Sequence, residues 1–306
     1  MEIENICIIM STYNGEQYVK EQIESILQQK NVNINIVIRD DGSTDSTFNI
    51  ISDFKNKNSN ISIIKGKNIG CKSSFYEAAK IATKLHPDIS YFAFSDQDDV
   101  WLPEKAYKGI YAIKSKTEKR PILYFCHPKI VDAKLQPTGQ SWDAANNLTF
   151  EEGCLVQTCA GCTMIFNRAS LDLYLQGNPE NMSLHDSWMY KAVLACNGIV
   201  LEDKDKYILY RQHGNNVVGT QNFYSRWKRR YNMFLHGNSY RSKQVGLILD
   251  TYHNKMTEET KYVAYILSTY KSSIKKKCKI IFSKRFRTGR LISNTLFVIS
   301  IIFNRY

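Results

Sequence analysis

The strongest indication of the architecture is the stretch Tyr91-Phe92-Ala93-Phe94-Ser95-Asp96-Gln97-Asp98-Asp99. Its first half is an apolar run of the length expected for a buried β-strand. Its second half sets three carboxylates within four positions, and carboxylates this close repel one another unless a cation or water lies beside them. Asp96 and Asp98 are therefore predicted to bind one divalent metal at the carboxyl end of a strand. The alternative is a solvated acidic turn in which Asp99 caps a helix that opens at Pro103.

Outward from this stretch, short apolar strands alternate with amphipathic helices over residues 5–115. Strands are predicted at residues 6–10, 34–38, 61–64 and 91–94, and helices at 17–28, around 48–54, at 73–85 and from Pro103 onward. After residue 120 the pattern loosens, with strands expected at 122–126, 163–166 and 207–210, a helix at 186–196 and helical sequence from about residue 224. This alternation indicates an α/β fold, a parallel sheet with helices on both faces.

Charge divides the 306-residue chain unevenly. Residues 221–306 carry 18 lysines and arginines against three acidic residues, a net charge of +15, whereas residues 1–220 carry a net charge of −3. We therefore predict a domain of residues 1–220 followed by a basic helical region of residues 221–306. Such a region is expected to meet an anionic surface, either nucleic acid or the cytoplasmic leaflet of a membrane.

The N-terminus predicts a cytosolic protein, because Met1-Glu2-Ile3-Glu4 lacks the basic start of a secretory leader. No run approaches the roughly 18 apolar residues of a membrane-spanning helix. The eight cysteines are therefore expected to be reduced. Cys159 and Cys162 have the C-x-x-C spacing, but no second pair and no local histidine accompany them. We interpret them as core thiols rather than as a zinc or redox site.

Two further polar loops follow the first and second predicted strands, Ser11-Thr12-Tyr13-Asn14-Gly15-Glu16 and Arg39-Asp40-Asp41-Gly42-Ser43. Both are expected at the sheet edge that carries the acidic stretch, the edge at which doubly wound folds bind nucleotides. Neither G-x-G-x-x-G nor a Walker lysine is present, which excludes the common dinucleotide and P-loop types of site. Asp41 could instead accept the imide N–H of a uracil or thymine ring, on whose face Tyr13 could stack.

Residues 40–45 have a structural alternative as well. They could form a tight turn in which Gly42 adopts the left-handed conformation and Ser43 or Thr44 caps the next helix. The two interpretations are compatible, because a cap uses one group and leaves the others available.

The loops together resemble the nucleotide-binding half of the inverting glycosyltransferases of family 2. The resemblance covers about residues 5–115 and rests on Ser11-Thr12-Tyr13-Asn14, Asp40-Asp41-Gly42-Ser43-Thr44-Asp45, Asn68-Ile69-Gly70 and Ser95-Asp96-Gln97-Asp98-Asp99. The form Ser-Asp-Gln-Asp-Asp-Val-Trp resembles the bacterial rhamnosyltransferase-like branch, which builds capsule, O-antigen and cell-wall polysaccharides. It implies a GT-A fold (Rossmann-like, with a mostly parallel sheet), a nucleoside-diphosphate sugar donor and a Mg²⁺ or Mn²⁺ ion.

The resemblance also implies roles for individual residues. Asp41 matches the base-reading aspartate, Asp96 the ribose or metal contact, and Asp98 the principal metal ligand. Further contacts with the nucleotide sugar are expected from Thr12, Tyr13, Asn14, Glu16 and Asn68.

The acceptor half, residues 116–220, contains the predicted base. An inverting transfer needs a group that takes the acceptor hydroxyl proton, and the family places an aspartate for this at the start of a helix. Asp186, in Leu184-His185-Asp186-Ser187-Trp188, matches that position; a plain N-cap is the alternative. Arg211 could bind the diphosphate and His213 the metal, unless both lie in a solvated surface loop.

The basic region of residues 221–306 is compatible with several partners. Residues 291–303, flanked by Arg290 and Arg305, predict an interfacial helix that docks on anionic lipid near a lipid-linked saccharide acceptor. The alternatives are packing on the catalytic domain, a homo-oligomer contact, or nucleic acid, which nothing in residues 1–220 would act upon. The Gln-x-x-Arg-Trp motif of processive relatives is missing, although Ser225-Arg226-Trp227 partly resembles it.

The sequence thus predicts a non-processive, metal-dependent, inverting glycosyltransferase, peripheral on the inner face of the cytoplasmic membrane. Its first expected donor is dTDP-β-L-rhamnose, which inversion would convert to an α-L-rhamnoside, and a UDP-hexose is the alternative donor. Two other classes remain as hypotheses: an inactive nucleotide-sugar sensor and a nucleic-acid-binding α/β protein.

Overall fold

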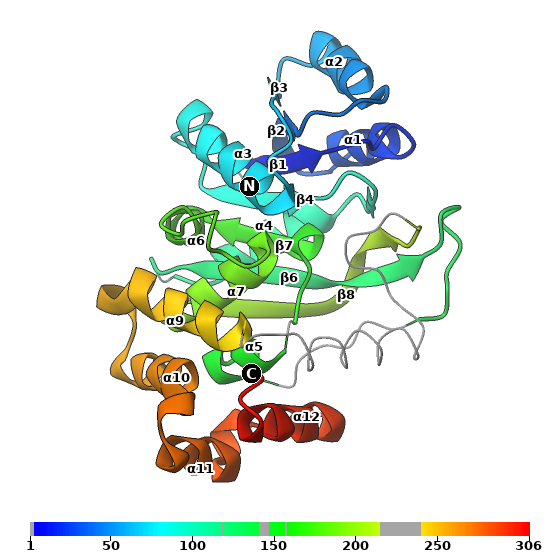
Figure 1. Ribbon diagram of the computed structural model, residues 1–306. Helices are drawn as coiled ribbons and strands as arrows, with labels where there is room; N and C mark the ends of the chain where they lie inside the picture. Colours follow the sequence, from blue (N-terminus) through cyan, green and yellow to red (C-terminus); the bar gives the residue numbers. More distant parts are fainter. Residues whose placement is uncertain (1–2, 118, 141–146, 157, 215–239) are drawn as a thin grey trace. The chain divides into compact units, whose positions relative to one another are not determined.

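The computed structural model describes residues 3–117, 119–140, 147–156, 158–214 and 240–306 (Figure 1). The chain forms two compact units. The sheet unit comprises Met1–Trp142, Cys159–Val193 and Gly198–Gln212, and the helical unit comprises Asp143–Thr158, Leu194–Asn197 and His213–Tyr306. The predicted boundary at residue 220 lies outside the described residues. The same is true of Arg226, Lys228, Arg229 and Arg230, which belong to the predicted basic region.

The sheet unit is built on a mixed sheet. Its described strands are β1 (Glu4–Thr12), β2 (Val32–Asp40), β3 (Ile61–Lys65), β4 (Tyr91–Ser95), β5 (Val100–Trp101), β6 (Ile122–Val131), β7 (Met164–Asn167) and β8 (Ile199–Arg211). They lie in the order β3-β2-β1-β4-β7-β6-β8-β5 (Figure 1). The first four in this order are parallel, β7 is antiparallel to β4 and β6, and β8 is parallel to β6. The predicted mostly parallel sheet is confirmed.

Helices cover both faces of this sheet. They are α1 (Val19–Leu27), α2 (Thr47–Lys57), α3 (Cys71–Leu85), α4 (Lys105–Lys114), α6 (Arg168–Tyr174) and α7 (His185–Ala195). Side chains alternate between faces along a strand, and Ile8 of β1 shares one core with α1, α2 and α4. On the opposite face Phe94 of β4 contacts Phe75 of α3, Tyr174 of α6 and His185 of α7. Residues 6–10 of β1 are fully buried because both faces are covered.

Some element boundaries differ from the prediction. Helix α4 begins at Lys105 rather than at Pro103, whose carbonyl accepts a hydrogen bond from the Lys30 N–H (2.9 Å). Strand β8 begins at Ile199, well before the predicted residue 207, because pairing with β6 keeps its charged first half extended. The two residues of β5 were not predicted, since only their pairing with β8 defines them.

The helical unit consists of α5 (Phe150–Leu155), α9 (Tyr240–Tyr252), α10 (Glu258–Thr269), α11 (Ile274–Phe282) and α12 (Leu291–Ile302). Tyr306 is buried here: its hydroxyl donates to the Cys154 carbonyl (3.1 Å) and its N–H to the Tyr270 hydroxyl (3.2 Å). The prediction of a helical C-terminal region is thus confirmed for residues 240–306. Within the described part of the chain, no helix is long and apolar enough to cross a membrane.

Candidate functional site

The loops after β1 and β2 are joined by hydrogen bonds. Asn14, in the left-handed region at φ 47°, donates its N–H to the Ser43 Oγ (3.0 Å) and accepts the Thr44 N–H on its Oδ1 (2.9 Å). Glu16 accepts the N–H of Ser46 (2.8 Å). Asn14 and Glu16 were predicted to contact the nucleotide sugar. Their side chains hold the two loops together, and a contact with the donor stays a prediction.

The turn after β2 forms as expected, but its capping differs. Gly42 has φ 79°, the left-handed conformation predicted for it. Helix α2 begins only at Thr47, whose N–H donates to the Asp45 Oδ1 (3.0 Å). The predicted cap by Ser43 or Thr44 is therefore wrong, because both residues bind Asn14 instead.

Asp41 is buried and organises the turn that carries Asn68. Its carboxylate accepts hydrogen bonds from the Arg39 guanidinium, from the Ile69 N–H (2.9 Å) and from the Gly70 N–H (2.9 Å). A carboxylate offers about four acceptor sites. Three of these sites are occupied by the donors above, so one acceptor site of Asp41 remains for a further donor such as a base imide.

The loop after β1 is also tied to the acidic stretch. The Gln97 amide accepts the Tyr13 N–H (2.8 Å) and donates to the Tyr13 carbonyl (3.0 Å). The Tyr13 ring is 46% exposed, whereas the Thr12 hydroxyl is buried with no hydrogen-bond partner among the described residues. The three polar loops therefore meet at one sheet edge, as the strand order requires.

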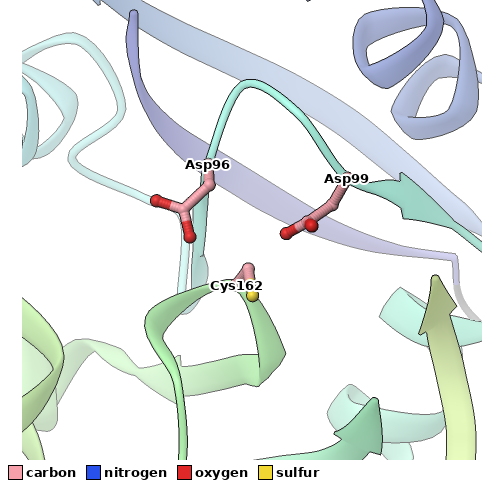
Figure 2. Close-up of side chains that lie close together, drawn as sticks. All are labelled: Asp96, Asp99 and Cys162. Atoms are coloured by element: carbon pink, nitrogen blue, oxygen red, sulfur yellow. The ribbon is translucent and has the colours of Figure 1, made fainter. Parts of the chain in front are cut away.

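The acidic loop after β4 faces a cysteine. Figure 2 shows Asp96 and Asp99 on the loop after β4, with Cys162 of the short 3₁₀ helix η1 (Gly161–Thr163) close to both. One ligand atom of each residue lies within 4.8 Å of the others. Asp99 is fully buried; its Oδ1 accepts the Arg211 N–H (3.1 Å), and its carboxylate also interacts with the Cys162 thiol.

Charge crowding in this loop favours a cation. Burial, followed by the negative charges of Asp98 and Asp186, raises the pKa of Asp96 to about 7. Burial and the charges of Asp98 and Asp96 raise the pKa of Asp99 well above its usual value. Closely spaced carboxylates whose pKa values are raised in this way fit the expected Mg²⁺ or Mn²⁺. His213, the other predicted ligand, belongs to the helical unit, and its role stays a prediction.

Arg211 fixes the acidic loop from the end of β8. Its Nε donates to the Asp98 carbonyl (2.8 Å) and its Nη1 to the Ala133 carbonyl (2.7 Å), while its Nη2 pairs with Glu21. The guanidinium lies 4.5 Å from the Tyr18 ring centroid. These contacts indicate a structural role, and the predicted binding of diphosphate by Arg211 stays a prediction.

Asp186 lies at the start of α7, where the sequence placed it. It is buried, its Oδ1 accepts the Ser187 N–H (2.6 Å) and its Oδ2 accepts the Gly161 N–H (3.3 Å). Both hydrogen bonds fix the orientation of this carboxylate, the predicted general base. Gly161 directly precedes Cys162, so η1 connects the predicted base with the acidic loop.

His185, the residue before the predicted base, is packed away from the site. Its ring stacks on Phe75 (3.9 Å between centroids) and meets Phe94 edge-on (4.9 Å). Burial lowers the pKa of His185, so the ring is neutral at pH 7. A Cβ at Gly161 would come within 2.3 Å of the His185 Nε2, which explains the glycine at that position.

Cys71, the first residue of α3, reveals how the acids converge. Burial, together with the negative charges of Asp96, Asp186, Asp41 and Asp98, raises the pKa of its thiol to about 12. These four acids come from three separate segments: the loop after β2, the loop after β4 and the start of α7. Cys71, Cys162 and Asp99 were not predicted for the site; the spacing of Cys159 and Cys162 was the one available signal.

Comparison with known proteins agrees with this geometry. Residues 7–174 match the family described as Glycosyl transferase family 2. The dTDP-rhamnosyl transferase RfbG of Shigella flexneri is 32% identical over 232 residues, 72% of this chain and 77% of that protein. This chain belongs to glycosyltransferase family 2. It is accordingly a transferase, which disfavours the nucleic-acid-binding hypothesis.

Three further proteins resemble this family 2 member, one over a shorter stretch of sequence and two in their fold. The Escherichia coli UDP-Glc:alpha-D-GlcNAc-diphosphoundecaprenol beta-1,3-glucosyltransferase WfaP is 37% identical over 114 residues, 37% of this chain and 43% of that protein. Staphylococcus aureus TarS bound to UDP superposes with a TM-score of 0.56 at 18% identity, covering 92% of this chain and 75% of that one. The Pyrobaculum calidifontis mannosyltransferase PcManGT with GDP-Man and Mn²⁺ gives 0.53 at 13% identity, covering 98% and 80%. These structures confirm the GT-A fold.

Proposed function

We propose that this family 2 glycosyltransferase moves one L-rhamnosyl residue from dTDP-β-L-rhamnose to a saccharide acceptor with inversion at the anomeric carbon. The observation that carries the proposal is that the loops bearing Asp41, Asp96 and Asp98 lie at one edge of the sheet, and that Asp186 accepts the N–H of Gly161, which adjoins Cys162 beneath the acidic loop. Such a gathering supplies a base-reading acid, metal ligands and a general base within one site. The similarity to a dTDP-rhamnosyl transferase supports the donor. A UDP-hexose is the second candidate, supported by the similarity to WfaP.

In this proposal the loops after β1 and β2 receive the nucleotide. The exposed ring of Tyr13 stacks on the base, and the remaining acceptor site of Asp41 takes its imide N–H. Thr12, Asn14, Glu16 and Asn68 line the same edge, where their present hydrogen bonds hold the loops in shape.

Asp96 and Asp98, beside Asp99, would hold Mg²⁺ or Mn²⁺ on the donor diphosphate. When bound, the ion supplies positive charge that stabilises the departing diphosphate. His213 and Arg211 complete the proposed set on the metal and the diphosphate.

Asp186 performs the proton transfer. As the acceptor oxygen attacks the anomeric carbon, the bond from that carbon to the diphosphate oxygen breaks, and the electron pair leaves with dTDP. The hydroxyl proton passes to Asp186, whose carboxylate is oriented by the N–H groups of Gly161 and Ser187. Attack from the opposite face converts the β-L donor into an α-L product.

In this proposal the helical unit binds to the surface of the membrane. Ile274, Phe282 and Leu291 are 79%, 82% and 80% exposed. Residues 240–306 carry 14 lysines and arginines against three acids. Exposed apolar side chains among basic ones fit an anionic leaflet. The acceptor proposed is therefore a lipid-linked saccharide at the inner face of the cytoplasmic membrane, and the product a bacterial surface polysaccharide.

Thermal stability against a panel of UDP-, dTDP- and GDP-sugars, with and without Mn²⁺, tests the proposal. A donor at about 100 times its Kd stabilises a protein by about 2.7 kcal/mol. We expect a Mn²⁺-dependent rise in Tm with dTDP-rhamnose that Asp98→Asn removes. A rise with a UDP-hexose alone would replace the donor, and no rise with any nucleotide sugar would overturn the proposal.

A further inference from the structure

The loop that leads into the proposed base is attached to helix α3. Residues 175–184 connect the end of α6 with the start of α7, which carries Asp186. The ammonium of Lys72, in the first turn of α3, donates to the Glu180 carbonyl (2.8 Å) and to the Met182 carbonyl (3.3 Å). These two carbonyls lie six and four residues before Asp186. The attachment is therefore close to the point where the loop enters α7.

A second side chain of α3 holds the other end of this loop. Tyr76 lies one helical turn after Lys72, and residues four apart share a face of a helix. Its hydroxyl donates to the Leu175 carbonyl (2.8 Å), and its ring centroid lies 5.8 Å from that of Tyr174 at the end of α6. One face of α3 thus contacts the loop near both of its ends.

The loop also packs against α7. A Cβ at Gly177 would come within 2.6 Å of the Trp188 Nε1 and within 2.7 Å of the Met182 Sδ, so the loop backbone lies directly on these buried side chains. The Met182 N–H donates to the Asn178 carbonyl (3.0 Å), and the Trp188 N–H donates to the Leu184 carbonyl (2.9 Å). A shift of the loop would therefore displace the first turn of α7.

The start of α7 needs this support because the hydrogen bonds of Asp186 supply little of it. One of its two N–H partners belongs to Ser187, which moves with the same helix. The other, from Gly161, is long at 3.3 Å. A general base must lie within hydrogen-bond reach of the hydroxyl that it deprotonates, and a misplacement of about 1 Å can lower turnover by about 10²-fold.

We propose that Lys72 is a positioning residue for sugar transfer: it attaches the loop before α7 to α3 and thereby holds Asp186 at the distance that proton transfer requires. Tyr76 supports the attachment from the same face of α3. Lys72 also follows by two residues Gly70, whose N–H donates to Asp41 (2.9 Å). The first turn of α3 thus joins the proposed nucleotide-binding edge to the segment that carries Asp186. This inference rests on the proposed function, in which Asp186 is the base.

Hydrogen exchange of the full chain tests the attachment without any ligand. Lys72→Met removes the ammonium and keeps most of the length of the side chain. We expect the amides of residues 180–190 to exchange at least about 10-fold faster, because hydrogen bonds from a charged group are lost. The amides of the buried strand β1 should be unchanged, which would show that the fold is intact. Lys72→Arg retains a donor for these carbonyls and should exchange like the wild type.

Release of dTDP from dTDP-rhamnose with Mn²⁺, with water as the acceptor, tests the effect on turnover. In this hydrolysis the water oxygen bonds to the anomeric carbon, the bond to the diphosphate oxygen breaks, and a water proton passes to Asp186. We expect Lys72→Met to lower kcat by about 10-fold or more, with the KM for the donor within about twofold of the wild type. In the Asp186→Asn background Lys72→Met should cause no further loss, because Lys72 acts through Asp186.

Lys80→Met is the matched control. Lys80 lies on α3 as well, but its ammonium faces Glu77 of the same helix (4.0 Å), so exchange and kcat should both equal those of the wild type. Unchanged exchange in Lys72→Met would overturn the attachment. A raised donor KM with an unchanged kcat, or an equal loss of rate in the wild-type and Asp186→Asn backgrounds, would overturn the positioning role.

The two measurements separate this inference from the proposed function. Wild-type protein that hydrolyses dTDP-rhamnose, together with a Lys72→Met variant of equal kcat, refutes the positioning role alone. Wild-type protein that responds to no nucleotide sugar refutes the proposed function and with it the role of Lys72 in transfer, whereas faster exchange in Lys72→Met would still establish the attachment of the loop to α3.

Discussion

Asp186 is held by two backbone N–H groups, and its proposed role depends on its ability to take a proton. Asp186→Asn keeps the size of the side chain but cannot accept the acceptor proton. Loss of a general base lowers turnover by about 10²–10⁴-fold. We expect that loss in a transfer assay, with the Tm response to donor retained. The exposed Asp172 on α6 provides the control, because Asp172→Asn should transfer at the wild-type rate. An active Asp186→Asn would contradict the assignment.

Lys105 is fully buried, with its ammonium 3.4 Å from the centroid of the Trp101 ring. Burial lowers the pKa of Lys105 to about 8, whereas the unfolded chain has the ordinary value of 10.5. Between pH 8 and 10.5 the unfolded state binds more protons, so stability rises with pH in this window. At pH 7 the desolvated charge costs up to about 3 kcal/mol, partly offset by the ring contact of about 1–2 kcal/mol.

Lys105→Met should therefore be more stable than the wild type at pH 7, and the gain should shrink as the pH approaches 10.5. Urea unfolding at pH 7 and pH 10 measures the difference. A variant that is less stable at pH 7, or whose difference is the same at both pH values, would show that the buried ammonium is not desolvated as described.

The sequence predicted where Asp41, Asp96 and Asp186 lie, because the first two directly follow strands and the third opens a helix. Their roles stay predictions. The approach of Cys162 to Asp99 could not be predicted in the same way. Their meeting depends on how η1 packs beneath the loop after β4, which no spacing within the sequence encodes.

At the scale of elements, α1 carries a buried polar stripe that holds the acidic loop. The Gln22 amide donates to the Ser95 Oγ (2.7 Å) at the end of β4, and the Ser25 Oγ accepts the Trp101 N–H (3.0 Å) of β5. Gln29 donates to the Leu102 carbonyl (2.8 Å). Helix α1 thus fixes the backbone on both sides of residues 96–99.

Ser25→Ala would leave the buried Trp101 N–H without an acceptor, which costs about 1–3 kcal/mol. We expect this loss in urea unfolding, together with a smaller Tm rise from donor and Mn²⁺ because one end of the acidic loop is released. Ser52→Ala on α2 is the matched control, since the Ser52 hydroxyl donates only within its own helix (2.7 Å to the Phe48 carbonyl). Equal effects from the two serines would refute the positioning role of α1.

The apolar face of α1 was predictable from spacing, but its polar stripe was not. Val19, Ile23 and Ile26 recur at helical intervals and are buried as predicted. Gln22 and Ser25 are buried too, although their residue types favour solvent. Their partners lie more than 70 residues further along the chain, so only the tertiary arrangement shows why they are inside.

At the scale of the whole molecule, residues 240–306 combine a net positive charge with the most exposed of the large apolar side chains that the structure describes. Each basic group near an anionic leaflet contributes roughly 1 kcal/mol, and burying a Phe or Leu side chain contributes about 1.5–3 kcal/mol. Binding to a membrane should therefore require anionic lipid and weaken as the salt concentration rises. It should also depend on exposed apolar side chains such as Phe282 and Leu291, a dependence that attraction between charges alone would not produce.

Phe282→Glu combined with Leu291→Glu tests this dependence without disturbing the core, because both side chains are about 80% exposed. Co-sedimentation with phosphatidylglycerol vesicles should weaken by more than about 10-fold, since two apolar contacts are lost and two repulsive charges added. Tyr111→Glu, at a 60% exposed position on α4, should bind like the wild type. Unchanged binding by the double variant would show that Phe282 and Leu291 do not lie at the membrane surface. No binding of the wild type to anionic vesicles would remove the membrane from the proposed function while leaving the chemistry of the sheet unit untouched.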